Sequence, residues 1–184
     1  MHKNIKSVQE KTKGAFELMR EAFAYKNPMQ TPKIEKVVVS VGFGSIKDKD
    51  KKKIDLIADR LSKITGQKPA SRAAKKSIAS FKLREGEPIG YQVTLRGPRM
   101  VGFLDKLLNI ALPRTRDWRG IQTKAIDEIG NLTIGIKEHT IFPETSDEEL
   151  KDVFGMAITV VTAAKSKEEA KAFLTHLGFP FRKQ

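Results

Sequence analysis

The segment 88–97, with the sequence PIGYQVTLRG, alternates between large apolar side chains and polar or small ones. An extended chain places every second side chain on the same side, so a period of two predicts a half-buried β-strand. The predicted inward positions are Ile89, Tyr91, Val93 and Leu95, and the outward positions are Gly90, Gln92, Thr94 and Arg96. Such a strand requires a sheet with one covered face and one open face, which restricts the fold strongly.

Strand patterns and helix patterns alternate along the rest of the chain. Alternating or β-branched runs predict further strands within 33–44, 131–139 and 155–164. Apolar residues at helical spacing predict helices within 4–25, 48–66, 99–114 and 166–178, and Ser7 and Glu10 stand at capping-box spacing at the opening of the first. Because strands that alternate are typical of antiparallel sheets, the predicted fold class is α+β. We expect an open, mostly antiparallel sheet with helices packed on one face and a polar opposite face.

The length of 184 residues predicts a single domain over 1–184. We expect an N-terminal helix at 4–25, an α+β core at 33–180 and an extended basic loop at about 71–86. This loop, SRAAKKSIASFKLREG, has too many cations for a core segment and too few turn signals for a short connection.

The chain has 35 Lys and Arg against 22 Asp and Glu, a formal net charge of +13. A surplus of this size predicts attraction to polyanions, nucleic acid first and an anionic membrane surface second. The charge is concentrated, because residues 67–99 hold eight basic side chains against two carboxylates. A second cluster, PRTRDWRG, holds three arginines within 113–120.

The outward side of the predicted sheet indicates the same class of partner. If Val37, Val39 and Val41 face the helices, the outward residues are Lys36, Ser40, Gln92, Thr94, Arg96, Thr133 and Lys137. Hydroxyls, an amide and cations suit sugar and phosphate oxygens. This face lacks the paired aromatics that stack splayed bases, so a folded RNA fits better than a single strand. An ordinary solvated sheet face is the alternative interpretation.

The residues that most reaction chemistry needs are missing or scattered. The absence of cysteine excludes disulfides, thiol nucleophiles and iron–sulfur clusters. The histidines at 2, 139 and 176 lack metal-ligand spacing, and GFGSIK has Lys47 where a dinucleotide fingerprint has its third glycine. Neither a Walker-type phosphate loop nor a G-x-S-x-G motif is present. We therefore expect no catalytic residue, no metal and no cofactor.

Two other classes of function stay open. An enzyme acting on RNA would need a cofactor fingerprint, a metal set or an acid–base pair in the basic region. A membrane-surface binder would need a basic amphipathic helix, and Glu10, Glu17 and Glu21 dilute the charge of the N-terminal helix. Neither a signal-peptide core nor a run of roughly 18 apolar residues is present, so we expect a cytoplasmic location and no membrane partner.

Seven blocks of sequence, in this order, resemble the bacterial large-subunit ribosomal protein five (uL-five) family. They are KNPMQTPKIEKVVVSVGFG, ITGQKP, AKKSIASFKLREGEPIGYQVTLRG, FLDKLLNIALPRTRDWRG, GNLTIGIKEHTIFPE, GMAITVVTAAKSKEEAKAFL and GFPFRK. The resemblance covers roughly residues 7–183. It implies an α+β fold and a non-catalytic, ribosomal protein. It also implies that the protein binds 5S rRNA and helps attach it to large-subunit rRNA in the central protuberance. Further implied partners are P-site tRNA and a small-subunit head protein across an intersubunit bridge.

The resemblance also implies particular contact residues. The expected 5S rRNA-binding residues are Ser40, Gln67, Lys68, Thr94 and Arg96, with Ser40 standing where the family usually has asparagine. The expected tRNA-contacting loop carries Arg72, Lys75, Lys76, Ser77, Ile78 and Ala79. The other expected basic RNA contacts are Lys36, Lys82, Arg84, Arg99, Arg114, Arg116 and Arg119. We expect Ile78 and Phe81 to anchor the base of the loop or to cover a sugar face, and the loop to be mobile until RNA orders it.

Overall fold

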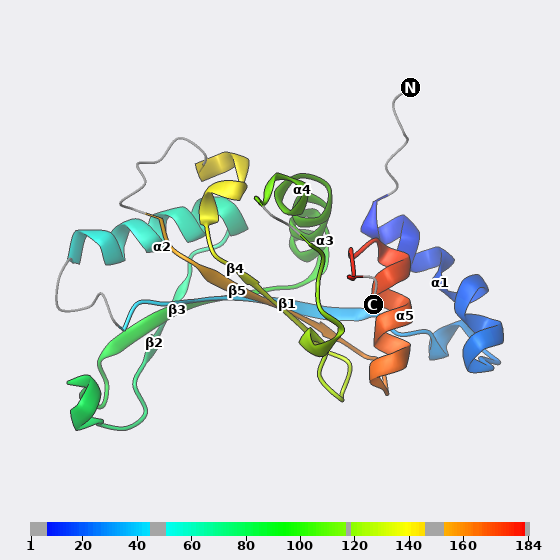
Figure 1. Cartoon of the computed structure of the whole chain (residues 1–184), viewed down its shortest axis with the longest axis horizontal. Helices are drawn as coiled ribbons and strands as arrows, with labels where there is room; N and C mark the ends of the chain where they lie inside the picture. Colours follow the sequence, from blue (N-terminus) through cyan, green and yellow to red (C-terminus); the bar gives the residue numbers. More distant parts are fainter. Residues whose placement is uncertain (1–6, 45–50, 117–118, 146–152, 183–184) are drawn as a thin grey trace. The chain divides into compact units, whose positions relative to one another are not determined.

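Five strands form one sheet in the order β2–β3–β1–β5–β4 (Figure 1). The computed structural model describes residues 7–44, 51–116, 119–145 and 153–182. The strands are β1 (Ile34–Gly42), β2 (Ala70–Ala73), β3 (Pro88–Leu95), β4 (Leu132–Ile136) and β5 (Met156–Thr162). The helices are α1 (Val8–Phe23), α2 (Lys51–Thr65), α3 (Gly97–Lys106), α4 (Leu112–Arg114) and α5 (Lys167–Leu177), with a π-helical segment η3 (Leu107–Ala111) between α3 and α4.

The sheet is antiparallel, which confirms the predicted α+β class. β2 pairs with β3 in antiparallel register, with Arg72 opposite Gly90. At the strand ends, the Phe43 N–H donates to the Ile89 carbonyl and the Ala163 N–H donates to the Lys33 carbonyl, both at 2.9 Å. Each predicted strand is present, and β2 is a strand that the sequence patterns did not predict.

The chain forms two compact units, which are described separately. The terminal unit consists of Met1–Val37, Leu95–Ile134 and Thr159–Gln184. The hairpin unit consists of Val38–Thr94 and Gly135–Ile158. The single domain expected from length stays a prediction.

In the terminal unit, α1 packs against α5 and α3. The helix begins where predicted at its N-cap, because Ser7 and Glu10 form a reciprocal capping box. The Lys11 ammonium donates to the Leu177 carbonyl at 2.9 Å, and the Val8 N–H donates to an Asp105 carboxylate oxygen at 2.8 Å. These contacts fix α1 to both neighbouring helices.

The predicted helix at 99–114 is interrupted by the π-helical segment η3. The Leu112 N–H donates to the Leu107 carbonyl, five residues earlier. Pro113 explains this widening, because a proline in a regular α-helix lacks an N–H and clashes with the carbonyl four residues before it.

A buried carboxylate in the terminal unit joins α5 to the chain that follows α1. The side chain of Glu169 is only 6% exposed and accepts hydrogen bonds from the Tyr25 hydroxyl and from the Lys165 N–H, the latter at 2.6 Å. Burial, together with the hydrogen bond and charge of Glu169, raises the pKa of Tyr25. The phenol therefore stays protonated and keeps donating.

Replacing Tyr25 with phenylalanine should lower the free energy of unfolding by about 1–3 kcal/mol, because a buried carboxylate loses a donor. Urea denaturation followed by circular dichroism measures this loss. Tyr91→Phe is the matched control, since no hydrogen bond joins the Tyr91 hydroxyl to another described residue. A Tyr25→Phe variant as stable as the parent chain would refute this role of the hydrogen bond.

In the hairpin unit, the inward side of the strands and α2 form the apolar core. Figure 1 shows α2 lying along one side of β1 and β3. The fully or almost fully buried side chains here include Val39, Val41, Phe43, Ile57, Leu61, Ile64 and Val93. The opposite side of β1, β2 and β3 is therefore not part of this apolar core.

Candidate nucleic-acid interface

The strands of the hairpin unit present their polar side chains on the side away from this core. Val39 and Val41 are buried, whereas Ser40 between them is partly exposed. Along β3, Val93 is buried while Gln92 and Thr94 are partly exposed. This burial pattern agrees with the predicted outward orientation of Ser40, Gln92 and Thr94.

Gly90 departs from this alternation because it is buried. A Cβ atom at this position would lie 2.7 Å from the Val41 carbonyl oxygen. Glycine therefore permits the close approach of β3 to β1, which brings the polar side chains of the two strands near each other.

Three polar side chains form a row across β2, β3 and β1, which we call the outward row. The Arg72 Nε–H donates to the Gln92 Oε1 at 2.6 Å. The Gln92 amide Nε2 donates to the Ser40 Oγ at 3.5 Å, a long contact. The guanidinium keeps its terminal N–H groups for another acceptor, and a guanidinium held at one nitrogen is oriented for bidentate phosphate binding.

Gln92 is a further candidate site residue, which the alternation of β3 places on the outward side but which is absent from the expected contact residues. Its position between Ser40 and Arg72 depends on β2, and β2 was not predicted. The one sequence feature that pointed to Gln92 is its position on the same side of β3 as Thr94.

Gln67 and Lys68 lie in the turn between α2 and β2. The helix ends at Thr65, whose hydroxyl donates to the Leu61 carbonyl at 2.7 Å and to the Gln67 carbonyl at 3.1 Å. Gly66 follows with a φ of +67°, a conformation that favours glycine. Gln67 is partly exposed and Lys68 is exposed, and neither forms a hydrogen bond with the outward row within the described residues.

The segment expected as an extended basic loop at about 71–86 lies at the end of a β-hairpin. Its first residues belong to β2, and the remainder forms a structured turn, which we call the hairpin tip (residues 74–87). The Ala74 N–H donates to the Glu87 carbonyl at 2.8 Å, and Ile78 and Leu83 exchange two backbone hydrogen bonds of 2.9 and 3.1 Å. The turn η2 (Ala79–Phe81) closes the hairpin tip.

The hairpin tip carries the residues expected to contact tRNA except Arg72, which lies on β2, together with two further predicted cations. Lys75, Lys76, Ser77, Ile78, Ala79, Lys82 and Arg84 are all exposed. Phe81 is 76% exposed, so the first of its two expected roles, anchoring the base of the loop, is wrong, and covering a sugar face stays a prediction. The backbone hydrogen bonds hold the hairpin tip without this ring.

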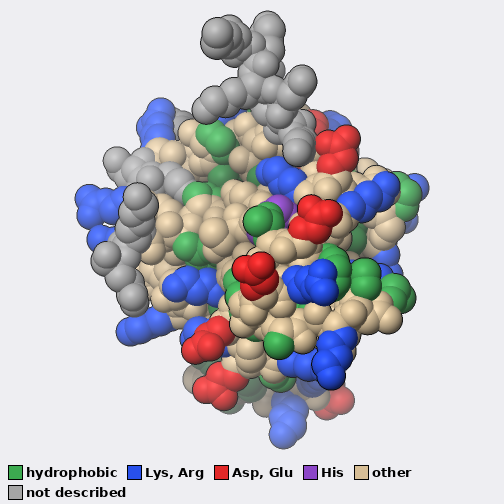
Figure 2. All heavy atoms as spheres, turned by 90° about the vertical axis from the view of Figure 1, so that its right-hand side faces the viewer, with side chains coloured by type: hydrophobic (Ala, Val, Ile, Leu, Met, Phe, Trp, Pro, Cys, Tyr) green, Lys and Arg blue, Asp and Glu red, His purple; other side chains and the backbone are tan. Residues whose placement is uncertain are grey.

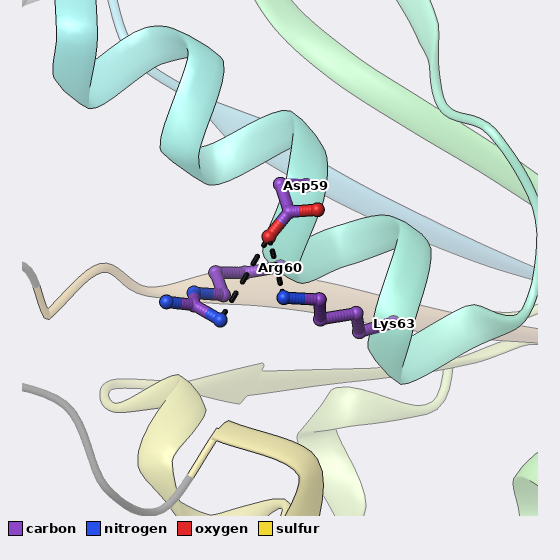
Figure 3. Close-up of polar contacts among 3 residues, drawn as sticks. All are labelled: Asp59, Arg60 and Lys63. Carbon is purple, nitrogen blue, oxygen red and sulfur yellow. Dashed lines mark ion pairs between the residues drawn. The ribbon is translucent and has the colours of Figure 1, made fainter.

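The cations of the hairpin tip differ from those of α2 in their neighbours. On α2, the Asp59 carboxylate contacts the Lys63 ammonium at 2.9 Å and the Arg60 guanidinium at 3.7 Å (Figure 3). Both Asp59 and Lys63 are about half exposed, so this pair contributes only a few tenths of a kcal/mol. Within the described residues, the four cations of the hairpin tip form no ion pair. Their charge therefore attracts an external anion.

The other predicted basic contacts lie in the terminal unit. Arg96, Arg99, Arg114, Arg116 and Arg119 are exposed, and Lys36 is partly exposed. Trp118, the aromatic residue of the second basic cluster, lies outside the described residues.

Figure 2 views the side of the molecule on which α1 and α5 lie in Figure 1, and it shows acidic side chains interspersed among the basic ones. Mixed charge of this kind does not favour the membrane-surface alternative. In the part of the chain that the structure describes, no helix is both long and apolar enough to span a membrane. The same residues contain no group of three or more His, Asp or Glu arranged to hold a metal ion.

Tyr91 packs inward rather than serving as a base platform. The centroid of its ring lies 5.0 Å from the centroid of the Phe43 ring, and the two ring planes are tilted by 50°. Burial, and to a smaller extent the charge of Asp55, raises the pKa of Tyr91. This agrees with the sequence pattern, which placed Tyr91 on the inward side of β3.

Two family models match most of this chain. The model for ribosomal protein L5 matches residues 27–84, and the model for the C-terminus of the same ribosomal protein family matches residues 88–181. The chain is 54% identical over 164 residues to the large ribosomal subunit protein uL5 of Trichlorobacter lovleyi, covering 89% of this chain and 91% of that protein. It is 53% identical over 161 residues to the uL5 protein of Brevibacillus brevis, covering 88% and 89% of the two chains. For the uL5 protein of Thermoanaerobacter sp., the identity is 51% over 165 residues, with 90% and 92% covered.

Proposed function

We propose that this chain, which belongs to the ribosomal protein L5 (uL5) family, binds 5S rRNA through the outward face of its sheet and helps attach it to large-subunit rRNA. Members of this family are structural, non-enzymatic proteins of the large ribosomal subunit, and this chain is one of them. Its place is therefore the ribosome, which is cytoplasmic in bacteria.

The outward row is the observation that carries the 5S rRNA proposal. It presents a guanidinium, an amide and a hydroxyl side by side, with the Thr94 hydroxyl two residues further along β3. The outward positions of β1 and β3 include no carboxylate and no aromatic ring. Such a surface suits phosphate and 2′-hydroxyl contacts with a folded RNA, because it offers no platform for splayed bases.

Ser40 fits this proposal although the family resemblance leads one to expect asparagine. A hydroxyl is both donor and acceptor but reaches less far than an amide. Gln92 supplies an amide beside it, since its Nε2 lies within 3.5 Å of the Ser40 Oγ. We propose that Ser40 and Gln92 share the RNA contact that a longer side chain would make alone.

We further propose that the hairpin tip contacts P-site tRNA and takes part in a bridge to a small-subunit head protein. The family resemblance suggests these partners, and the exposed cations and small residues of the hairpin tip suit close approach to phosphates. Arg72 then lies between the two regions, on the strand that leads from the outward row to the hairpin tip.

Reversing Lys75 and Lys76 to glutamate should weaken P-site tRNA binding to assembled ribosomes by about tenfold at low salt, because two phosphate contacts become repulsive. The fold should be unaffected, since both side chains are exposed. Filter binding of tRNA to reconstituted ribosomes measures the effect. Lys167→Glu together with Lys171→Glu on α5 gives the same change of charge away from the hairpin tip and serves as the control. Equal tRNA affinity for both double variants would contradict the assignment.

A mobility-shift titration tests the 5S rRNA proposal. The full-length chain should shift 5S rRNA in the presence of excess tRNA, and the logarithm of the affinity should fall linearly with the logarithm of the salt concentration. Binding that tRNA abolishes would mean that the net charge produces only non-specific attraction, and the proposal would fail.

A further inference from the structure

An aromatic side chain lies almost fully in solvent at the end of the hairpin tip. Phe81 is 76% exposed and Ile78 beside it is 42% exposed. Other large apolar side chains are exposed elsewhere, such as Leu18 and Met29, but among the described residues Phe81 is the one strongly exposed aromatic. In Figure 1 the hairpin tip projects beyond β2 and β3, with no other labelled element of the hairpin unit beside it. The ring thus adds nothing to the core.

Two backbone hydrogen bonds close the turn around Phe81. The Phe81 N–H donates to the Ile78 carbonyl at 3.2 Å, and the Lys82 N–H donates to the Ala79 carbonyl at 3.0 Å. Lys82 has a φ of +47°, which is uncommon for a residue with a long side chain. Hydrogen bonds that close the turn reduce the conformational entropy that is lost when a partner contacts the ring.

The charges around the ring indicate the chemistry of its partner. Lys75, Lys76, Lys82 and Arg84 are all exposed on the same short hairpin. The carboxylate of Glu87 turns back onto the chain and accepts from the Arg84 N–H at 2.8 Å. An apolar flat ring set among cations complements a ligand that combines a flat apolar face with nearby negative charge. An unpaired nucleotide has both properties, and base–aromatic stacking is a common source of RNA affinity.

We infer that the Phe81 ring stacks on an unpaired base of the RNA that the hairpin tip contacts. The cations of the hairpin tip hold the phosphates on either side, and Ile78 covers the adjoining sugar. This inference rests on the proposed function, since it assumes that the hairpin tip meets RNA. It adds that the contact selects RNA with an accessible base over fully paired RNA.

Fluorescence of a 2-aminopurine base tests the inference. The probe is a short RNA stem-loop with 2-aminopurine at an unpaired loop position, titrated with the full-length chain beside a fully paired duplex of the same length. Binding of the parent chain should quench the fluorescence by stacking. Phe81→Ala should remove the quenching and weaken stem-loop binding by about tenfold, while duplex affinity stays the same. Phe81→Tyr should retain quenching, and Phe81→Leu should lose it, because leucine keeps apolar bulk without a π-face.

Met29→Ala is the matched control, because Met29 is 74% exposed and lies outside the hairpin unit. It should leave both RNA affinities and the quenching unchanged. Unaltered quenching in Phe81→Ala would overturn the inference, as would an equal loss of affinity for stem-loop and duplex.

Binding of 5S rRNA by the same variants separates the two proposals. If Phe81→Ala binds 5S rRNA normally and quenches the stem-loop fluorescence as strongly as the parent chain, only the stacking inference fails. If the parent chain does not bind 5S rRNA, the proposed function fails instead.

Discussion

Replacing Thr94 with glutamate should weaken 5S rRNA binding by about 1–3 kcal/mol, the scale of a polar group left without its partner at a contact surface. Thr94 lies on the outward side of β3, between buried Val93 and Leu95, so its substitution changes the surface and leaves the core intact. A carboxylate at this position places negative charge against RNA phosphates and also fills space that the RNA backbone needs. Mobility-shift titration at fixed salt concentration measures the loss.

Two further variants separate charge from position. Thr175→Glu makes the same substitution at an exposed threonine on α5, and it should change 5S rRNA affinity only slightly. Thr94→Val removes the hydroxyl but keeps the shape, and it should give an intermediate loss. Equal losses for Thr94→Glu and Thr175→Glu would mean that net charge alone sets the affinity, contrary to the proposed contact surface.

Replacing Phe43 with alanine should lower the free energy of unfolding by about 3–5 kcal/mol, the usual range for a large aromatic residue removed from a core. Phe43 is completely buried at the end of β1, where its ring packs 5.0 Å from the Tyr91 ring. Its N–H donates to the Ile89 carbonyl, so the same residue closes the pairing of β1 with β3. Since domains are typically stable by about 5–15 kcal/mol, this is a large share of the total. Urea denaturation measures the change.

Phe81→Ala is the matched control for this stability prediction. It deletes the same side chain at a position that is 76% exposed, so the free energy of unfolding should change by less than about 0.5 kcal/mol. A loss below about 1 kcal/mol for Phe43→Ala would contradict the assigned role of Phe43 in the core. Comparing the two variants also tests whether the side chain of Phe81 in the hairpin tip contributes to the stability of the core.

The sequence predicts the structure correctly where one physical signal dominates. Alternation in β3 predicted which side of the strand carries Thr94, because half-burial imposes a period of two. The spacing of Ser7 and Glu10 predicted the start of α1, because their side chains satisfy each other's backbone N–H groups. These features depend on residues close together in the chain.

The features that were missed depend on contacts between distant residues. All four residues of β2 are exposed, so its sequence ASRA contains no alternation that could distinguish a strand from a loop. Its pairing with β3 creates the strand, and only then does Arg72 come within 2.6 Å of Gln92. The structured hairpin tip likewise follows from that pairing, because β2 and β3 bring its two ends together.

In the proposed function, the arrangement accounts for RNA contact by a modest polar surface. Isolated arginine side chains lose conformational entropy when they bind phosphate, whereas Gln92 already restrains the Arg72 guanidinium. The glycine at position 90 and the antiparallel pairing keep β1, β2 and β3 close enough for this restraint. We propose that net charge attracts RNA over a longer range and that the outward row fixes the position of the contact.

Directed hydroxyl-radical cleavage tests the central claim that the outward face of the sheet binds 5S rRNA. The chain has no cysteine, so a single introduced cysteine gives a unique position for an iron chelate. Val38→Cys places the chelate on β1 two residues from Ser40, on the outward side, and Thr175→Cys places it on exposed α5. Both complexes must first shift 5S rRNA with the affinity of the parent chain. We predict localised cleavage of 5S rRNA from position 38 and little or none from position 175. Strong cleavage from position 175 with none from position 38 would contradict the claim.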